Sequence, residues 1–278
     1  MLKDKDSQGL PVLARYDIAE GVVAFSTTRH GGAGKGGYGE FNINLYCGDD
    51  PAAVAANRKA LGRELGIPDD KILIPHQVHG VKCQTVTTDV LSATGEERAR
   101  LLDGVDGIMT DIRGVCIGVS TADCIPVLLY DKPHHAVAAV HAGWRGTVQR
   151  IALAAIDDMR LAYGTRPQDL LAIIGPGISL ENFEVGQEVY DEFEKQRFDM
   201  SLIAKRFPTR STGVDDGAGW KWHIDLPLCN RLQLESAGIP HSNIIQSGIC
   251  TYDRCADYFS ARRLGQASGR IYSGIFLK

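Results

Sequence analysis

Short apolar runs bounded by glycine, proline or charged residues recur along the chain, and they predict β-strands. The runs cover residues 22–28, 72–75, 115–120, 127–130, 136–140, 170–174, 244–249 and 270–277. In the last run, alternate residues share one face, namely Ile271, Ser273, Ile275 and Leu277. This alternation is typical of a strand that buries one side.

Other segments repeat their apolar residues at the helical period. One such stripe consists of apolar residues at 148, 151, 152, 155, 156 and 159, and Gly164 is its expected C-terminal stop. A second helix is indicated by Asp50 as N-cap before Pro51, and Gly66 closes it. Both segments therefore predict amphipathic helices that cover a sheet.

Further helices are expected from Asp225 to Gly238, over 184–193 and over the sequence GEERARLL at 95–102. The stretch 199–223 has turn chemistry and no period, so we interpret it as a loop. Strands and helices that do not strictly alternate favour an α/β fold of α+β-like character, with a mixed sheet flanked by helices.

Composition places the chain among ordinary globular proteins. Its 278 residues are 44% hydrophobic and 23% charged, without repeat or linker, so we expect residues 1–278 to form a single domain. A monomer or weak oligomer is adequate for this size. The formal net charge of −4 argues against a nucleic-acid partner but permits a small anionic substrate held by a few arginines.

The cysteines and the hydropathy of the chain indicate the cellular compartment in which we expect the protein. Seven cysteines at irregular spacing, without a CxxC pair, favour reduced thiols. The N-terminal residues are charged and lack an apolar signal region, and no apolar run approaches the length of a membrane span. We therefore expect a cytoplasmic protein without a membrane partner.

Polar clusters follow the predicted strands, where binding residues are commonly displayed. They are STTRHGG at 26–32, PHQVHG at 75–80, VSTADCIPVLLY at 119–130 and AVAAVHAGWRGTVQR at 136–150. Each cluster also has an ordinary interpretation: a hairpin with a solvated arginine, a surface histidine, a buried inert thiol, or a strand-to-helix turn. Taken singly, none of them decides a function.

Taken together, the clusters supply two imidazoles and a thiol, each at the end of an apolar segment: His79, Cys124 and His141. Three protein ligands with a vacant fourth position are the arrangement of catalytic zinc sites. Nitrogen and sulfur ligands suit zinc and also copper. Their spacing matches no zinc finger, so the residues alone leave the metal site as one alternative.

The motifs resemble those of the YfiH-like, or laccase-domain, family over nearly the whole chain. The matching segments include STTRHGG, QVHG, DGIMT, STADCIPVLL, AAVHAGWRGT, IGPGIS and YFSARR. The resemblance implies a metal site on His79, Cys124 and His141, with zinc as the expected cofactor and copper as a possible one. It also implies a mixed α/β fold related to the catalytic domain of cytotoxic necrotizing factor toxins.

The favoured activity implied by the resemblance is phosphorolysis of purine nucleosides, accompanied by deamination of adenosine. The partners would be a small nucleoside and phosphate. Catalytic roles fall to Cys124, His141 and Asp123. Phosphate contact is expected from Arg29, Arg145 or Arg263, stacking on the base from Trp144 or Phe259, and a further substrate contact from Gln77 of the QVHG motif.

Three alternatives stay open. The first is an amidase-like hydrolase that removes L-Ser from UDP-MurNAc-L-Ser in peptidoglycan editing, with Cys124 or metal-activated water attacking the amide. The second is a copper-dependent polyphenol oxidase, which we regard as less favoured because the eight histidines include no His-x-His pair. The third is a zinc-stabilised binding protein in which Cys250 or His76 closes the fourth ligand position.

Overall fold

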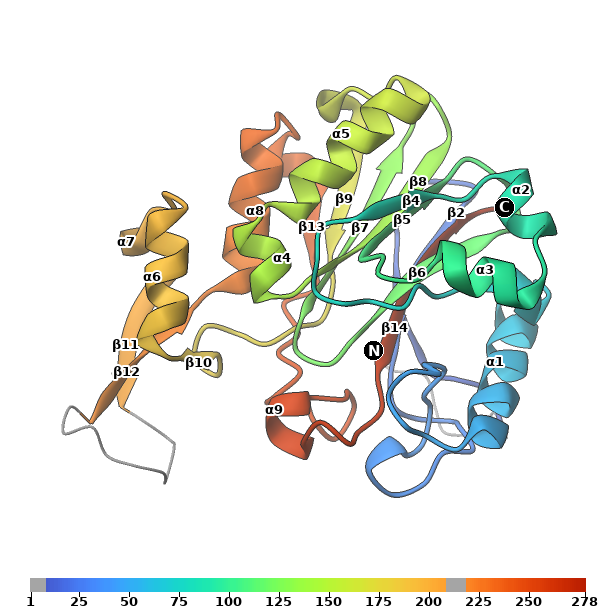
Figure 1. The fold of residues 1–278 in the computed structure, drawn as a ribbon, viewed down its shortest axis with the longest axis horizontal. Coiled ribbons are helices and arrows are strands. Elements are labelled where there is room, and N and C mark those ends of the chain that lie inside the picture. The colour runs from blue at the N-terminus through green and yellow to red at the C-terminus, as the bar shows by residue number, and fades with distance from the viewer. Residues whose placement is uncertain (1–8, 209–218) are drawn as a thin grey trace.

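Two β-sheets pack face to face at the centre of the molecule (Figure 1) in a computed structural model that describes residues 9–208 and 219–278. The five-stranded sheet has the order β1 (Leu13–Tyr16), β2 (Val22–Thr27), β14 (Ile271–Leu277), β6 (Cys116–Thr121) and β3 (Ile72–Leu73). The six-stranded sheet has the order β13 (Ile244–Gln246), β9 (Leu170–Ile174), β7 (Ile125–Asp131), β8 (Ala136–Ala142), β5 (Gly107–Thr110) and β4 (Cys83–Thr85).

Both sheets are mixed. In the first sheet β14 pairs antiparallel with β2 and β6, whereas β3 runs parallel to β6. In the second sheet β7 is antiparallel to β9 and β8, and β8 is antiparallel to β5, whereas the edge strands β13 and β4 run parallel to β9 and β5. The expected mixed sheet is therefore present, but as a pair of sheets.

Side chains of β8 alternate between two cores, because successive residues of a strand point to opposite faces. Val137 and Ala139 belong to the core between the sheets, together with Ile117 and Leu128. Ala138 and Val140 pack on the helices that cover the other face. His141 has the same parity as Val137 and Ala139, so its side chain points towards the space between the sheets at their end.

Helices cover the outer faces of both sheets. On the six-stranded sheet lie α4 (Trp144–Val148), α5 (Ile151–Tyr163) and α8 (Leu226–Ser236). On the five-stranded sheet lies α1 (Pro51–Leu65). Two short helices, α2 (Thr88–Ser92) and α3 (Gly95–Leu101), add Val90 and the following Leu102 to the core between the sheets. The result is a layered α/β fold (Figure 1).

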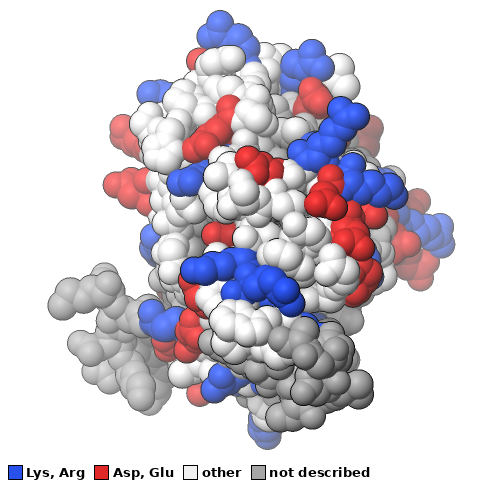
Figure 2. Space-filling model, turned by 90° about the vertical axis from the view of Figure 1, so that its left-hand side faces the viewer, with Lys and Arg blue, Asp and Glu red and all other residues white. Residues whose placement is uncertain are grey.

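A three-stranded antiparallel sheet projects from this body (Figure 1). It consists of β10 (Glu184–Val185), β12 (Trp220–Ile224) and β11 (Ala204–Pro208), with α6 (Gln187–Lys195) and α7 (Met200–Ile203) beside it. The remaining elements are α9 (Ala261–Leu264) and the 3-10 turns Gly36–Tyr38, Asp69–Lys71, Pro167–Asp169 and His241–Asn243. On the face that carries this sheet, basic and acidic side chains are interspersed (Figure 2).

Several sequence predictions are confirmed by helix termini. Asp50 caps α1 by accepting a hydrogen bond from the Ala52 N–H, and Gly66 ends that helix in the left-handed conformation. The segment 95–102 forms α3, which begins with a capping box between Thr94 and Glu97. No helix of the described residues is long and apolar enough to cross a membrane.

Three predictions are wrong in detail. The supposed loop at 199–223 contains α7, β11 and β12, while residues 209–218 lie outside the described part of the chain. Trp222 stabilises β12 by stacking on Tyr190, a tertiary contact that no local pattern shows. The helix predicted from the stripe at 148–159 is divided in two: Val148 ends α4, and α5 begins only at Ile151 because Arg150 adopts a left-handed conformation. The segment 184–193 is divided between β10 and α6.

Candidate metal centre

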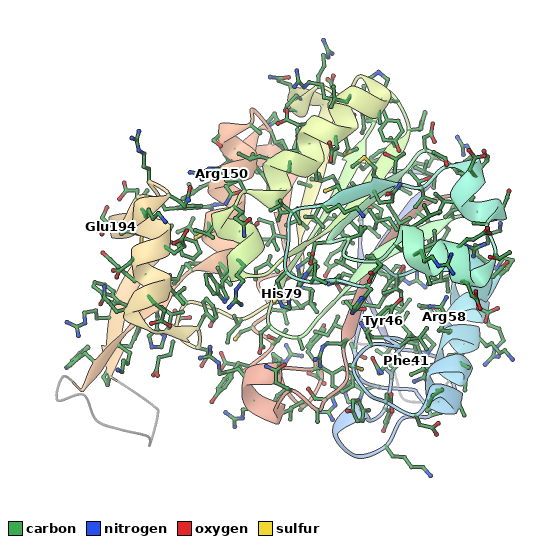
Figure 3. The ribbon with its side chains drawn as sticks, viewed as in Figure 1. Phe41, Tyr46, Arg58, His79, Arg150 and Glu194 are labelled. Atoms are coloured by element: carbon green, nitrogen blue, oxygen red, sulfur yellow. The ribbon has the colours of Figure 1, made fainter. Side chains whose placement is uncertain are left out.

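The predicted ligands His79, Cys124 and His141 converge at one end of the sheet sandwich. Their ligand atoms all lie within 4.8 Å of one another. The rings of His79 and His141 meet edge to face with centroids 4.8 Å apart. His79 is exposed, Cys124 is half-buried and His141 is buried, so the group opens to solvent on the His79 side. Figure 3 shows His79 in the middle of the view, with Tyr46 on the side of α1.

Strand register and two special backbone conformations bring these groups together. β7 pairs antiparallel with β8 so that Pro126 lies opposite His141, which sets Cys124 near the end of β8. Asp123, before the cysteine, has a φ of 91°, and His79 has a φ of 63°. Non-glycine residues adopt this region at an energetic cost, and such strain is found most often at functional sites.

Asp106, fully buried between β4 and β8, organises the centre. Its Oδ1 lies 2.8 Å from His141 Nδ1 and accepts a hydrogen bond of 2.9 Å from the His79 N–H. Its Oδ2 accepts from the N–H groups of Val78 and Gly80. The Asp106 carbonyl accepts from the His141 N–H at 2.7 Å. Because the imidazole donates from Nδ1, Nε2 of His141 is left for a metal ion.

Sequence reasoning assigned no role to Asp106, although it opens the DGIMT motif. The available signal was a carboxylate directly before a fully apolar strand, because a buried charge must be paired. Which residues pair it could not be read from the sequence, since His141 and the loop at 78–80 are distant along the chain.

Electrostatics favour the charged forms of the buried groups. Burial opposes ionisation of the Cys124 thiol, but His141 and His79 outweigh it and lower the pKa of Cys124 to about 6. Burial likewise opposes protonation of His141, but the Cys124 thiolate and Asp106 raise the pKa of His141 to about 9. Burial acts most strongly on Asp106 and raises its pKa, but the hydrogen bond and charge of His141 and the N–H groups of Gly80 and Val78 together outweigh burial and hold the pKa below its ordinary value. A thiolate beside two imidazoles is a donor set that fits zinc.

The three groups line a cavity of about 480 Å³, which is within the usual range for small-molecule sites. Its wall also contains Asn44, Tyr46, His76, Gln77, Ser120, Thr121, Asp123, Phe183, Arg262, Gln266 and Arg270. The Tyr46 ring lies over the His76 ring with centroids 4.4 Å apart. His76 Nδ1 is 2.6 Å from Asp103 Oδ1, so its Nε2 is available to a ligand. Aromatic, cationic and hydroxyl groups thus surround the candidate metal position.

Two of the predicted site residues lie in this wall with their polar atoms engaged. Asp123 accepts a hydrogen bond of 2.7 Å from the Thr251 hydroxyl and another of 2.7 Å from the Arg262 N–H. Gln77 donates to the Ser120 carbonyl and accepts from the Ser120 N–H. Both side chains therefore hold backbone segments of the wall in place.

The structure places the other predicted contact residues outside the cavity wall. Arg29 donates to the carbonyls of Gly39 and Cys255 and lies over the ring of Phe259, which is fully buried. Arg145 lies over the ring of Trp144, and Trp144 packs against the helix-covered core. The Arg263 guanidinium lies over Tyr252. Sequence reasoning missed Arg262 and Arg270, which do belong to the wall.

Neither suggested fourth ligand joins the group among the described residues, where the cluster consists of three side chains. Cys250 Sγ accepts a hydrogen bond from Asn182, and His76 is engaged by Asp103. The geometry therefore combines three possible metal ligands with an approach from the cavity.

Comparison with known proteins decides the family. Residues 23–278 match the family described as multi-copper polyphenol oxidoreductase laccase. The chain belongs to this family. The laccase-family chain also superposes on the crystal structures of YlmD from Geobacillus stearothermophilus and of the hypothetical protein YfiH from Bacillus licheniformis. The TM-score is 0.84 for both, at 32% and 30% sequence identity. The superposition on YlmD covers 100% of this chain and 98% of YlmD. The superposition on YfiH covers 98% of each chain.

Relatives within the family have enzymatic names. The laccase-family chain is 42% identical to a protein named purine nucleoside phosphorylase from Bacteroides thetaiotaomicron, over 99% of this chain and 97% of that relative. It is 40% identical to a protein named adenosine deaminase RL5 from an unknown prokaryotic organism, over 96% of this chain and 99% of that relative. Full-length similarity of this kind extends over every element that builds the cavity.

Proposed function

We propose that this protein is a zinc-dependent purine nucleoside phosphorylase that also deaminates adenosine. The observation that carries the proposal is the group His79, Cys124 and His141, which is open to a cavity of nucleoside-binding size. The names of the full-length relatives support the same two reactions.

The donor set fits zinc in number and chemistry. His79 and His141 would contribute imidazole nitrogens and Cys124 a thiolate, which its lowered pKa favours. Zinc bound there would supply Lewis acidity that lowers the pKa of a coordinated water to about 7. Asp106 would fix the tautomer and orientation of His141 and hold the loop that carries His79.

The residues of the wall would bind the nucleoside and handle its proton. The exposed ring of Tyr46 offers a face on which a purine can stack. His76, held by Asp103 through Nδ1, would move a proton at Nε2 to the departing purine. Asp123 would act as a positioning residue, since both of its oxygens hold neighbouring groups.

A turnover assay tests the proposal. Zinc-loaded protein is incubated with inosine and phosphate, or with adenosine alone, and ribose 1-phosphate and ammonia are measured. Cys124→Ala should abolish both products, whereas Cys83→Ala, outside the cavity, should retain them. Absence of both products from the zinc-loaded wild type would refute the proposed function.

A second candidate function has its own structural support. Cys124, His141 and Asp106 form a Cys-His-Asp series in which the thiol has a lowered pKa and the imidazole is oriented by a carboxylate. This series suits amide hydrolysis, such as removal of L-Ser from UDP-MurNAc-L-Ser. Metal-free protein that releases serine from this compound, and little alanine from the L-Ala counterpart, would favour the hydrolase.

The oxidase in the family's description receives less support. A multicopper oxidase needs a trinuclear cluster and a further copper site, whereas the eight histidines of this chain include no His-x-His pair. Copper at the His-Cys-His group would still be compatible with the donor set. We propose zinc as the functional metal, and the zinc-loaded assay above is the experiment that bears on this choice.

A further inference from the structure

A second cavity, which we call the side cavity, adjoins the metal cavity and shares Tyr46 with it. It has a volume of about 290 Å³ and is lined by residues of α1, α3, β3 and the segment 43–46. Figure 3 shows Tyr46 between His79, which lines the metal cavity, and Arg58, which lines the side cavity. The Tyr46 side chain is therefore a wall common to both cavities.

Aliphatic side chains form most of the wall of the side cavity. Ile72, Leu73 and Leu102 of this wall are buried, whereas Leu45 is 59% exposed and Tyr46 is 47% exposed. Large apolar side chains that stay exposed beside a concave surface commonly mark a binding site. An apolar ligand that covers them would gain the free energy of removing their surface from water.

The charged residues of this wall are engaged elsewhere. Arg58 donates from Nη2 to the carbonyls of Asp69 and Ile72. Arg98 donates from all three guanidinium nitrogens to four backbone carbonyls. Arginines whose head groups are held in this way present their aliphatic stems to the surface. Asp70 is exposed to solvent. The chemistry of the side cavity therefore favours an apolar group.

Small residues of α3 keep the side cavity open. Gly95, Ala99 and Leu102 follow one another at spacings of four and three, so they share the face of α3 that lines the cavity. A Cβ at Gly95 would meet no atom within 4 Å, and Ala99 is exposed. Larger side chains at these two positions would therefore narrow the cavity without displacing neighbouring groups.

Hydrogen bonds and stacking fix the wall between the two cavities. The Tyr46 N–H donates to Asn44 Oδ1 at 2.7 Å, and the Asn44 N–H donates to Asn42 Oδ1 at 3.1 Å. The Tyr46 ring lies over the His76 ring with centroids 4.4 Å apart. A purine that stacks on Tyr46 would lie beside both cavities. A substituent on that purine would then reach the side cavity.

A small apolar group fits this surface better than a second copy of the chain. Among the residues that line the side cavity, Leu45 and Tyr46 are the large apolar side chains that remain strongly exposed. A stable protein interface buries about 800 Å² on each partner, far more than two side chains provide. The concave shape and the contact with the metal cavity instead favour part of the substrate.

We propose that the side cavity binds an apolar substituent of the purine base, so that the enzyme accepts adenosines with an alkyl or benzyl group on the exocyclic nitrogen. This inference rests on the proposed phosphorolysis. In that reaction a phosphate oxygen forms a bond to the anomeric carbon of the nucleoside as the bond from that carbon to the purine nitrogen breaks. The electron pair of the broken bond leaves with the substituted purine, which takes up one proton. The products are ribose 1-phosphate and the substituted base.

Steady-state kinetics with N6-benzyladenosine and adenosine test the proposal, with ribose 1-phosphate as the measured product. The wild-type KM for N6-benzyladenosine should be about tenfold or more below that for adenosine, the gain expected from burying a phenyl group. Ala99→Leu and Gly95→Leu should each remove most of this preference and change the KM for adenosine much less. Ala56→Leu, at an exposed alanine of α1 that lines neither cavity, is the matched control. Equal KM values for the two nucleosides, or a preference that both α3 variants retain, would overturn the proposal.

Light scattering addresses the other occupant, a second copy of the chain. Wild type and Leu45→Ser should have the same mass in solution. A dimer that Leu45→Ser dissociates would assign the apolar edge of the side cavity to self-association and contradict the proposal.

A binding measurement separates this inference from the proposed function. N6-benzyladenine and adenine are titrated calorimetrically into zinc-loaded wild type and Ala99→Leu in the absence of ribose 1-phosphate, so that neither phosphorolysis nor its reversal takes place. Tighter binding of N6-benzyladenine that Ala99→Leu loses supports the side cavity even if turnover is absent. A wild type that carries out phosphorolysis yet binds both bases with equal affinity refutes this inference and leaves the proposed function intact.

Discussion

Asp106 Oδ1 lies 2.8 Å from His141 Nδ1, and both side chains are buried. The Asp106 carboxylate orients the His141 ring, and it also accepts hydrogen bonds from N–H groups of the loop that carries His79. One residue therefore positions two of the three candidate metal ligands.

Asp106→Asn should weaken zinc binding without removing a ligand. Loss of a partner that orients a metal-binding histidine typically reduces metal affinity about 10- to 100-fold. The asparagine can still accept from the backbone, but it no longer favours Nδ1–H of His141 by charge. Competition with a chromogenic chelator measures the affinity, and the exposed Asp111→Asn is the control. Equal affinity for zinc in wild type and Asp106→Asn would contradict this role.

In metal-free protein Cys124 should react as a thiolate from mildly acidic pH upward. The pKa of Cys124 is lowered to about 6 and that of His141 is raised to about 9. Iodoacetamide should therefore modify Cys124 half-maximally near pH 6, whereas burial raises the pKa of Cys83 and of Cys116 to about 12. Zinc should protect Cys124, and peptide mapping identifies the modified thiol. Half-maximal modification near pH 9 would show that the imidazoles do not stabilise the thiolate.

The same ion pair gives the metal-free fold a window of extra stability. The thiolate of Cys124 is lost as the pH falls through about 6, and the proton of His141 is lost as the pH rises through about 9. The free energy of unfolding of metal-free wild type, relative to Cys124→Ala, should therefore be highest between these values. Urea unfolding across this range measures it, and a flat difference would argue against the ion pair.

Gly143→Ala should disturb the metal centre by crowding alone. A Cβ at Gly143 would lie 3.0 Å from Cys124 Sγ and 3.0 Å from His79 Cδ2, tighter than ordinary contacts. The backbone of Gly143, with φ of −68°, accepts an alanine without strain. We expect weaker zinc binding with nearly unchanged urea unfolding of the metal-free protein. Gly95→Ala, where a Cβ meets nothing within 4 Å, is the control and should bind zinc as the wild type does.

The strands and the ligand residues could be predicted because their signals are local. Buried strands such as β7 and β8 are short apolar runs, and His79, Cys124 and His141 stand out at the ends of such runs. The prediction that these three residues converge came from motif resemblance. Helix caps such as Asp50 could also be predicted, because they depend only on neighbouring residues.

The wall of the cavity could not be predicted, because it is set by tertiary register. The sequence does not distinguish one arginine from another. In the structure Arg29 donates hydrogen bonds to the carbonyls of Gly39 and Cys255, whereas Arg270 lines the cavity. That difference depends on the pairing of β14 with β6, far apart along the chain. Strand β12 could not be predicted either, because it is stabilised by a tertiary contact: Trp222 stacks on a residue of α6.

X-ray absorption spectroscopy of the zinc-loaded protein tests the central claim, an open three-ligand metal centre, most directly. The account predicts one sulfur at about 2.3 Å, two nitrogens at about 2.0–2.1 Å and one further light ligand from solvent. It also predicts loss of the sulfur signal in Cys124→Ala. A coordination shell with two sulfurs, or one unchanged by Cys124→Ala, would contradict the account.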